Sequence, residues 1–252
     1  MRLLFLGVGE ACDSRHGNCS ILVHAKNTSF LLDCGFSVPH RFFYYCDDPD
    51  CIDNVWISHF HGDHFLGLPL LLLRFWEMGR TRPLQFIGQE NLQEKTLAAL
   101  ELAYPGFVDK LRFPLRFQTI TPGKTLTVKG LHLRAAISGH SQQNYGLLID
   151  DGDNRLYYSG DGRATEATRK LMHGCDLALH EAFTLRDSIP GHGSVASCLQ
   201  LMDEENIKQL ALLHLERTTR YREEETIKKF IADHPGLLLP KEDDRIVLGD
   251  PA

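Results

Sequence analysis

The sequence lacks a long apolar run. Its longest apolar stretch, residues 65–73, is interrupted by Gly67 and Pro69 and ends at Arg74, whereas a membrane-spanning helix needs about 20 apolar residues. The apolar segment at residues 1–6 is too short for the core of a signal peptide. The sequence therefore predicts neither a membrane span nor an export signal, and we expect a cytoplasmic protein.

The chain also lacks an excess of positive charge and a regular spacing of cysteines. It has 27 Lys and Arg against 33 Asp and Glu, a net charge of −6, which argues against a broad surface for coating nucleic acid. Its seven cysteines show no disulfide-framework spacing, so we expect most of them to be reduced thiols. Cys46 and Cys51 flank an acidic loop, but no second cysteine pair completes a metal clip there.

No low-complexity linker or internal repeat divides the 252 residues. Strand-like apolar runs lie at 2–6, 20–24, 30–33, 55–58, 115–120, 131–137, 145–150, 156–159, 177–180, 210–215 and 245–248. Helix-like patterns lie at 65–78, 89–103, 166–172, 194–204 and 223–231. The acidic turn at 151–154 predicts a hairpin between two of the strands. Long antiparallel stretches mixed with helices favour two sheets covered by helices.

One segment concentrates metal-binding side chains. His59, His61, Asp63 and His64 follow directly after the apolar strand at 55–58. An extended backbone sends His59 and His61 to the same side, because side chains alternate along a strand. Gly62 permits a sharp turn that brings Asp63 and His64 to the same volume. Imidazole and carboxylate ligands suit Zn²⁺, with Mn²⁺ or Fe²⁺ also open.

Three later residues are candidates for further ligands. His140 and Asp161 each follow an apolar strand and a glycine, and His214 lies in the apolar run at 210–215. Each taken alone is more simply a strand-end cap or a buried histidine. Because a loop of six residues cannot fully ligate two ions, the position of all three at strand ends favours a joint site.

These motifs resemble a known family. The sequence HFHGDH at 59–64 resembles the HxHxDH signature of the metallo-β-lactamase superfamily, and the closer likeness is to its ribonuclease Z branch. Further segments resemble motifs of that branch in order: Asp-Cys-Gly at 33–35, Gly-His-Ser at 139–141, Ser-Gly-Asp-Gly at 159–162, His-Glu-Ala at 180–182 and Leu-His-Leu at 213–215. Gly162 stands where threonine is usual. The resemblance implies an α+β fold, an αββα sandwich of two mixed β-sheets flanked by helices, as a single domain over residues 1–252.

The resemblance also implies a site with two divalent metal ions, of which Zn²⁺ is the leading choice. It assigns His59, His61 and His140 to one ion and Asp63, His64 and His214 to the second, with Asp161 bridging. Asp33 would orient a ligand imidazole from outside the ligand shell.

The resemblance assigns catalytic roles as well. A metal-bridging hydroxide would attack a phosphodiester, His192 would protonate the leaving group, and Glu181 would orient His192. Asp63 would share in proton transfer. The segment at 192–194 reads His-Gly-Ser where the branch has His-Ser-Thr, and the simpler interpretation of His192 is a loop residue before a helix capped by Ser194. Arg163 is a candidate phosphate contact.

The leading functional prediction is a metal-dependent phosphodiesterase acting on a small-molecule or nucleotide phosphodiester. The alternative is a ribonuclease Z-like endonuclease for tRNA 3′ processing, but only 21 residues separate His140 from Asp161, too few for that branch's basic tRNA-clamping arm. A lactone or thioester hydrolase, an iron-dependent redox relative and a non-catalytic binding module remain open as other classes. Relatives are often dimers, so a homodimer is also possible.

Overall fold

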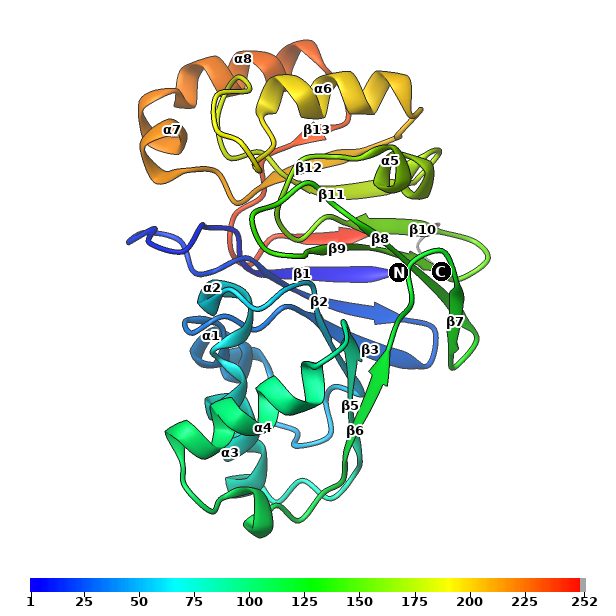
Figure 1. Cartoon of the computed structure of the whole chain (residues 1–252). Coiled ribbons are helices and arrows are strands. Elements are labelled where there is room, and N and C mark those ends of the chain that lie inside the picture. Colours follow the sequence, from blue (N-terminus) through cyan, green and yellow to red (C-terminus); the bar gives the residue numbers. More distant parts are fainter. Residues whose placement is uncertain (250–252) are drawn as a thin grey trace.

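Two seven-stranded β-sheets pack face to face, and helices cover the outer face of each, so the fold has four layers (Figure 1). This computed structural model describes residues 1–249, and the last three residues of the predicted 1–252 domain lie outside that range. The arrangement confirms the predicted αββα sandwich of mixed sheets.

The first sheet comes from the N-terminal half of the chain and one late strand. Its strand order is β14-β1-β2-β3-β4-β5-β6. The strands are β1 (Arg2–Gly7), β2 (Ser20–Ala25), β3 (Thr28–Leu32), β4 (Asn54–Ile57), β5 (Leu84–Gly88), β6 (Leu115–Thr119) and β14 (Arg245–Val247). The helices of this half are α1 (Val38–Tyr45), α2 (Gly62–Phe65), α3 (Leu68–Glu77), α4 (Leu92–Ala103) and the 3₁₀ helix η1 (Val108–Lys110).

The second sheet is formed by the C-terminal half, in the order β13-β12-β11-β10-β9-β8-β7. Its strands are β7 (Thr125–Val128), β8 (Leu131–Ile137), β9 (Tyr145–Asp150), β10 (Arg155–Tyr158), β11 (Leu177–Glu181), β12 (Leu210–Leu213) and β13 (Leu237–Leu238). Its helices are α5 (Glu166–Met172), α6 (Val195–Glu204), α7 (Arg217–Arg222) and α8 (Glu224–Asp233). The predicted hairpin is present as β9 and β10, which pair antiparallel.

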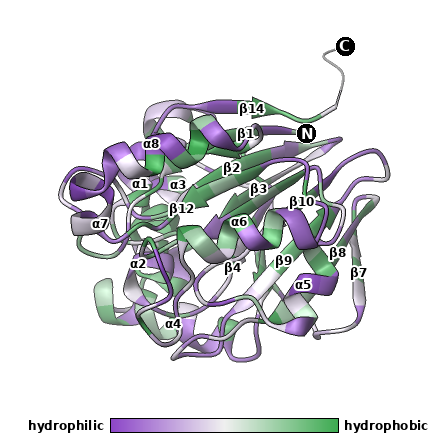
Figure 2. Cartoon of the chain, turned by 90° about the horizontal axis from the view of Figure 1, so that it is seen from above, coloured by the Kyte–Doolittle hydropathy of each residue, from purple (hydrophilic) through white to green (hydrophobic). Residues whose placement is uncertain are grey.

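The core has three parts, one between the sheets and one under each helical layer. Alternation along each strand decides which part a residue joins. In β10, Tyr158 joins the core between the sheets and Tyr157 joins the core under the C-terminal helices. Figure 2 shows the interior strands as largely hydrophobic and the outer helix α7 as largely hydrophilic. Within residues 1–249, none of the helices is both long and apolar enough to cross a bilayer.

The helix predicted at 65–78 is two helices, α2 and α3, separated by Leu66 and Gly67. A Cβ atom on Gly67 would lie 2.1 Å from the carbonyl oxygen of Gly35, so the chain needs glycine there for close backbone approach. Gly35 is equally constrained, because its Cβ would lie 1.9 Å from the carbonyl oxygen of Asp63. The backbone of Cys34 also accepts from the N–H of Gly67 at 2.9 Å. The Asp-Cys-Gly segment thus fixes the position of the segment that carries the predicted metal ligands.

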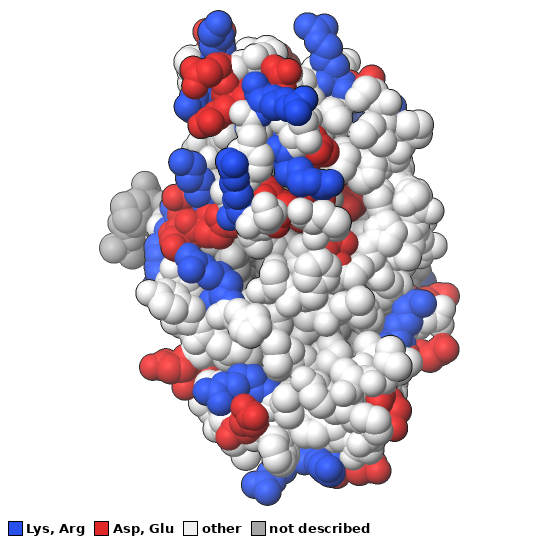
Figure 3. Space-filling model, turned by 90° about the vertical axis from the view of Figure 1, so that its left-hand side faces the viewer, with Lys and Arg blue, Asp and Glu red and all other residues white. Residues whose placement is uncertain are grey.

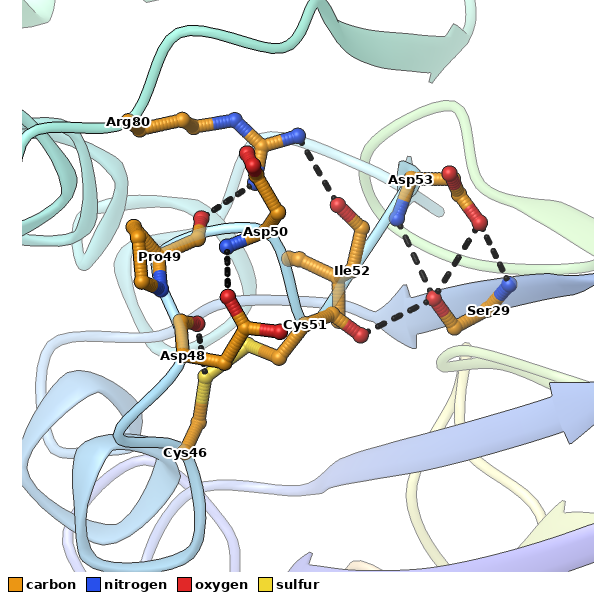
Figure 4. The surroundings of a disulfide bond; sticks show 9 residues. All are labelled: Ser29, Cys46, Asp48, Pro49, Asp50, Cys51, Ile52, Asp53 and Arg80. Carbon is orange, nitrogen blue, oxygen red and sulfur yellow. Dashed lines mark hydrogen bonds and ion pairs between the residues drawn. A yellow bond between two sulfur atoms is a disulfide. The ribbon is translucent and has the colours of Figure 1, made fainter.

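Cys46 and Cys51 form a disulfide, with their Cα atoms 6.3 Å apart (Figure 4). The other five cysteines are free, which agrees with the expectation that most cysteines would be reduced thiols. Cys46 and Cys51 are the exception. The loop between the two cysteines is also held by the buried guanidinium of Arg80. That group donates to the carbonyl oxygens of Pro49 at 2.7 Å and Ile52 at 2.9 Å.

Candidate metal centre

The predicted ligands come from α2 and from loops at one edge of the two sheets, on the side where α2 lies (Figure 1). His59 and His61 follow β4, and His61 is the residue before α2. Asp161 follows β10, and His214 follows β12. All seven predicted ligands therefore meet at this edge, because strands of both sheets end there.

The first ligand group contains three histidines and Asp161. Nδ1 of His61 lies 3.0 Å from Nε2 of His59 and 3.3 Å from Nε2 of His140. Oδ2 of Asp161 lies 3.7 Å from Nε2 of His59 and 3.9 Å from Nε2 of His140. The four candidate ligand atoms lie within 4.8 Å of one another.

The second ligand group contains Asp63, His64, His214 and again Asp161. Nε2 of His214 lies 3.2 Å from Oδ2 of Asp63 and 3.4 Å from Nε2 of His64. Oδ1 of Asp161 lies 3.1 Å from Nε2 of His64 and 3.5 Å from Nε2 of His214. Asp161 thus offers one oxygen to each group, which is the arrangement of a bridging carboxylate.

Unsatisfied atoms show that these residues fit metal ions. Oδ1 of Asp161 is buried and accepts no hydrogen bond of good geometry. In the first group, nitrogen atoms of His59 and His140 both face the single Nδ1 of His61, an arrangement that leaves lone pairs pointing at one another. Buried polar atoms without partners are costly. A divalent cation in each group would satisfy them, and imidazole with carboxylate is a suitable donor set for Zn²⁺.

Each of three ligand histidines has a partner for its other ring nitrogen. Nδ1 of His64 donates to Oδ2 of Asp33 at 2.7 Å. Asp33 therefore contacts a candidate ligand imidazole, as the resemblance implied. Nδ1 of His140 donates to the carbonyl oxygen of Gly191 at 2.9 Å, and Nδ1 of His59 lies 3.0 Å from Oγ of Ser58. Such partners fix the tautomer and orientation of a ligand imidazole.

Electrostatics at the second group favour cation binding. Burial would lower the pKa of His214, but the carboxylates of Asp161 and Asp63 outweigh it and raise that pKa to about 9. Burial would raise the pKa of Asp63, but hydrogen bonds from His214 and His64 hold it well below its usual range. A cation must displace a proton from His214, so metal uptake is favoured as the pH rises.

His192 lies beside the metal-binding residues, with Nδ1 hydrogen-bonded to Oε1 of the buried Glu181. Its ring stacks on Phe183, with centroids 4.4 Å apart. Burial would lower the pKa of His192, but the hydrogen bond and charge of Glu181 raise it above its ordinary value. Because Ser194 caps α6, the simpler interpretation of this segment is also partly met. The two interpretations are compatible, since the cap is two residues further on.

Arg163, the candidate phosphate contact, makes side-chain hydrogen bonds to two backbone carbonyl groups. Its Nε donates to the carbonyl oxygen of His192 at 2.8 Å, and one terminal nitrogen lies 3.3 Å from the carbonyl oxygen of Ile189. Its backbone also exchanges two hydrogen bonds with Gly139. Arg163 therefore joins the loop that carries His192 to the strand end that carries His140.

Sequence reasoning did not identify Tyr158, Gly191 or Phe183 as parts of this region. A backbone carbonyl such as that of Gly191 leaves no trace in the residue type. Tyr158 and Phe183 read as ordinary core aromatics, and only their places beside the Gly-Asp and His-Glu-Ala segments could have drawn attention to them.

Known proteins agree with this fold. Ribonuclease Z from Shouchella clausii (strain KSM-K16) is 24% identical over 299 aligned positions, covering 95% of this chain and 93% of that protein. The metallo-β-lactamase fold protein YhfI from Bacillus subtilis superposes with a TM-score of 0.81 at 19% identity, covering 97% of this chain and 98% of that one. The short form of human tRNase Z superposes with a TM-score of 0.79 at 20% identity, covering 99% and 100%.

The fold is therefore that of the metallo-β-lactamase superfamily, and the sequence is ribonuclease Z-like. Residues 1–235 match the sequence profile of the family described as Anti-Pycsar protein Apyc1. That match covers more than half of the chain, and the chain belongs to the Anti-Pycsar protein Apyc1 family.

Proposed function

We propose that this protein is a metal-dependent phosphodiesterase with two divalent ions, of which Zn²⁺ is the leading choice. The observation that carries the proposal is the pair of ligand groups that share Asp161, with His192 beside them. Two divalent ions bound by these two groups would supply Lewis-acid stabilisation of phosphoryl oxygens and a nucleophile at neutral pH.

The chain's own residues would manage the proton. Because Nδ1 of His192 is bonded to Glu181, Nε2 is the atom left to donate a proton to the leaving oxygen. The raised pKa of His192 keeps it protonated over more of the neutral range. Asp63 has a strongly lowered pKa, so it stays ionised and suits a metal ligand, and its share in proton transfer stays a prediction.

A small or cyclic phosphodiester is the substrate class that we favour. The segment between His140 and Asp161 contains only the β9–β10 hairpin and its turns, which leaves no room for a tRNA-clamping arm. On the face that includes α2 and α7, the described Lys and Arg side chains are interspersed with Asp and Glu (Figure 3). Such a surface offers little to an extended polyanion.

Ribonuclease Z-like RNA cleavage is the second candidate, favoured by the relative from Shouchella clausii. The alignment with that relative spans 299 positions, more than the 252 residues of this chain, so the relative carries segments without a counterpart here. A lactone or thioester hydrolase ranks below both. The homodimer and the cytoplasmic location stay predictions.

The first test is metal content. Purified protein should contain about two divalent ions per chain by plasma emission analysis, since seven ligands are too many for one tetrahedral ion. His61→Ala and Asp161→Ala should each lower that number, and His173→Ala, an exposed histidine on the far end of α5, should not. A folded wild type without metal would overturn the proposal.

The second test compares substrates at equal enzyme concentration. Bis-p-nitrophenyl phosphate and a cyclic mononucleotide should be hydrolysed with a higher kcat/KM than a precursor tRNA transcript is cleaved. The reverse order would replace the proposal with RNA processing, and activity only on a thioester or lactone would replace it with carbonyl hydrolysis.

A further inference from the structure

The hydroxyl of Tyr158 reaches towards the metal centre from the second sheet, although Tyr158 is not a candidate ligand. Tyr158 ends β10, is fully buried, and donates a 2.7 Å hydrogen bond to Oδ2 of Asp33. The same oxygen accepts from Nδ1 of His64 at 2.7 Å. A hydroxyl of one sheet therefore holds a carboxylate of the other, and that carboxylate holds a ligand imidazole.

Asp33 depends on these donors because it is a completely buried carboxylate. Its Oδ1 accepts from the backbone N–H of Ser58 at 2.7 Å, and its Oδ2 accepts from Oγ of Ser58 at 2.7 Å. The backbone of Asp33 has φ of 57°, a conformation that needs support from its surroundings. Of the donors to Asp33 in the described part of the chain, Tyr158 is the one that comes from the second sheet.

We propose that Tyr158 is a positioning residue for the second ligand group. Its hydroxyl fixes the carboxylate of Asp33, which keeps the proton of His64 on Nδ1 and leaves Nε2 free to bind a metal ion. This inference rests on the proposed metal centre but not on its substrate. Loss of an outer partner of a metal ligand commonly costs 10–100-fold in metal affinity. Tyr158→Phe should therefore lower the affinity for one of the two ions about tenfold.

Tyr157 provides a matched control. It precedes Tyr158 on β10 and is equally buried, and within residues 1–249 its hydroxyl has no hydrogen-bond partner of good geometry. It packs in the core under the C-terminal helices, on the opposite face of the strand. Tyr157→Phe therefore removes the same atom from the same strand without touching Asp33.

The experiment is zinc competition against a chromophoric chelator for the wild type, Tyr158→Phe and Tyr157→Phe, combined with thermal unfolding of each apoprotein. We expect Tyr158→Phe to bind one ion about tenfold more weakly than the wild type, and Tyr157→Phe to match the wild type within twofold. Zinc should raise the Tm of Tyr158→Phe less than it raises the Tm of the control. A lower apoprotein Tm with unchanged zinc affinity would mean a purely structural role and overturn the inference.

A double-mutant comparison tests the route through Asp33. In the Asp33→Asn background, Tyr158→Phe should cost less than twofold in zinc affinity, because the residue through which it acts is already altered. A full tenfold loss in that background would overturn the inference. If Asp33→Asn does not fold, the comparison of zinc affinity between Tyr158→Phe and Tyr157→Phe still tests the inference. A wild type that binds no zinc would instead overturn the metal centre itself, so the two failures are distinguishable.

Discussion

His140 donates a 2.9 Å hydrogen bond from Nδ1 to the carbonyl oxygen of Gly191, the residue directly before His192. One short loop therefore orients a candidate metal ligand through its backbone and presents the candidate acid through its next side chain. Under the proposed function, metal binding and leaving-group protonation would both depend on this loop, and substitutions there can be sorted by which of the two they disturb.

Replacing His192 by alanine should discriminate between leaving groups. A p-nitrophenolate leaves without a proton, whereas an alkoxide needs one, and a positioned acid supplies about 10²–10⁴-fold. We expect His192→Ala to lower kcat/KM by that factor for an alkyl diester and by far less for bis-p-nitrophenyl phosphate, with metal content unchanged. Equal losses on both substrates, or loss of metal, would remove His192 from the acid role.

The pH profile should depend on Glu181. A general acid must be protonated, so kcat/KM for a poor leaving group should fall as the pH rises through the pKa of His192, which Glu181 raises. In Glu181→Gln, burial becomes the dominant influence on the pKa of His192 and lowers it. The fall in kcat/KM on the alkaline side, the alkaline limb, should therefore move to lower pH. With a p-nitrophenolate leaving group the limb should disappear. An alkaline limb at the same pH in the wild type and in Glu181→Gln contradicts the assignment.

Arg163 should act through the loop. Arg163→Ala removes the hydrogen bonds to the carbonyls of His192 and Ile189. It should lower kcat/KM about tenfold for a poor leaving group, comparable to the loss of an outer partner at a metal site. Arg163→Lys should not restore activity, because an ammonium lacks the planar fork that reaches both carbonyls. Arg169→Gln, on the surface of α5, is the control. Full activity in Arg163→Lys would show that positive charge alone matters, as in a phosphate contact.

RNA binding should be weak. With a net charge of −6 and a short hairpin in place of an arm, filter binding of a precursor tRNA at physiological salt should give a Kd well above the nanomolar range. The binding should also weaken steeply as salt is added. Nanomolar binding at physiological salt would restore RNA as the leading substrate.

Gly67→Ala should destabilise the fold. The backbone of Gly67 has φ of −78° and ψ of −16°, which alanine adopts easily, so the cost comes from the clash with the Gly35 carbonyl. We expect a loss of about 3 kcal/mol in the free energy of unfolding, measured by urea denaturation. Gly17→Ala is the control, because the nearest atom to its added Cβ lies at 3.4 Å. Equal stability of the two variants would show that the backbone yields.

The sandwich and the meeting of all seven predicted ligands could be predicted from the sequence. Apolar runs mark where strands end, and the residue types at those ends mark which side chains could bind a metal ion. The sequence did not predict β5, β7 or the short β13, whose few residues carry little periodic signal. The sequence also predicted one helix where the structure has α2 and α3, separated by Leu66 and Gly67. The break could not be predicted because it depends on the close approach of Gly35, which comes from a distant part of the chain. The residue type of Arg163 likewise did not reveal that its side chain contacts the carbonyl groups of His192 and Ile189.

The two histidines of the second ligand group, His64 and His214, are 150 residues apart in sequence. Closing so long a loop carries an entropic cost that has to be met before the contact forms, and folds rich in distant contacts fold slowly. The second ligand group therefore exists only after both sheets have formed and docked. Zinc would bind the native state selectively and slow unfolding, and it would do little to speed folding.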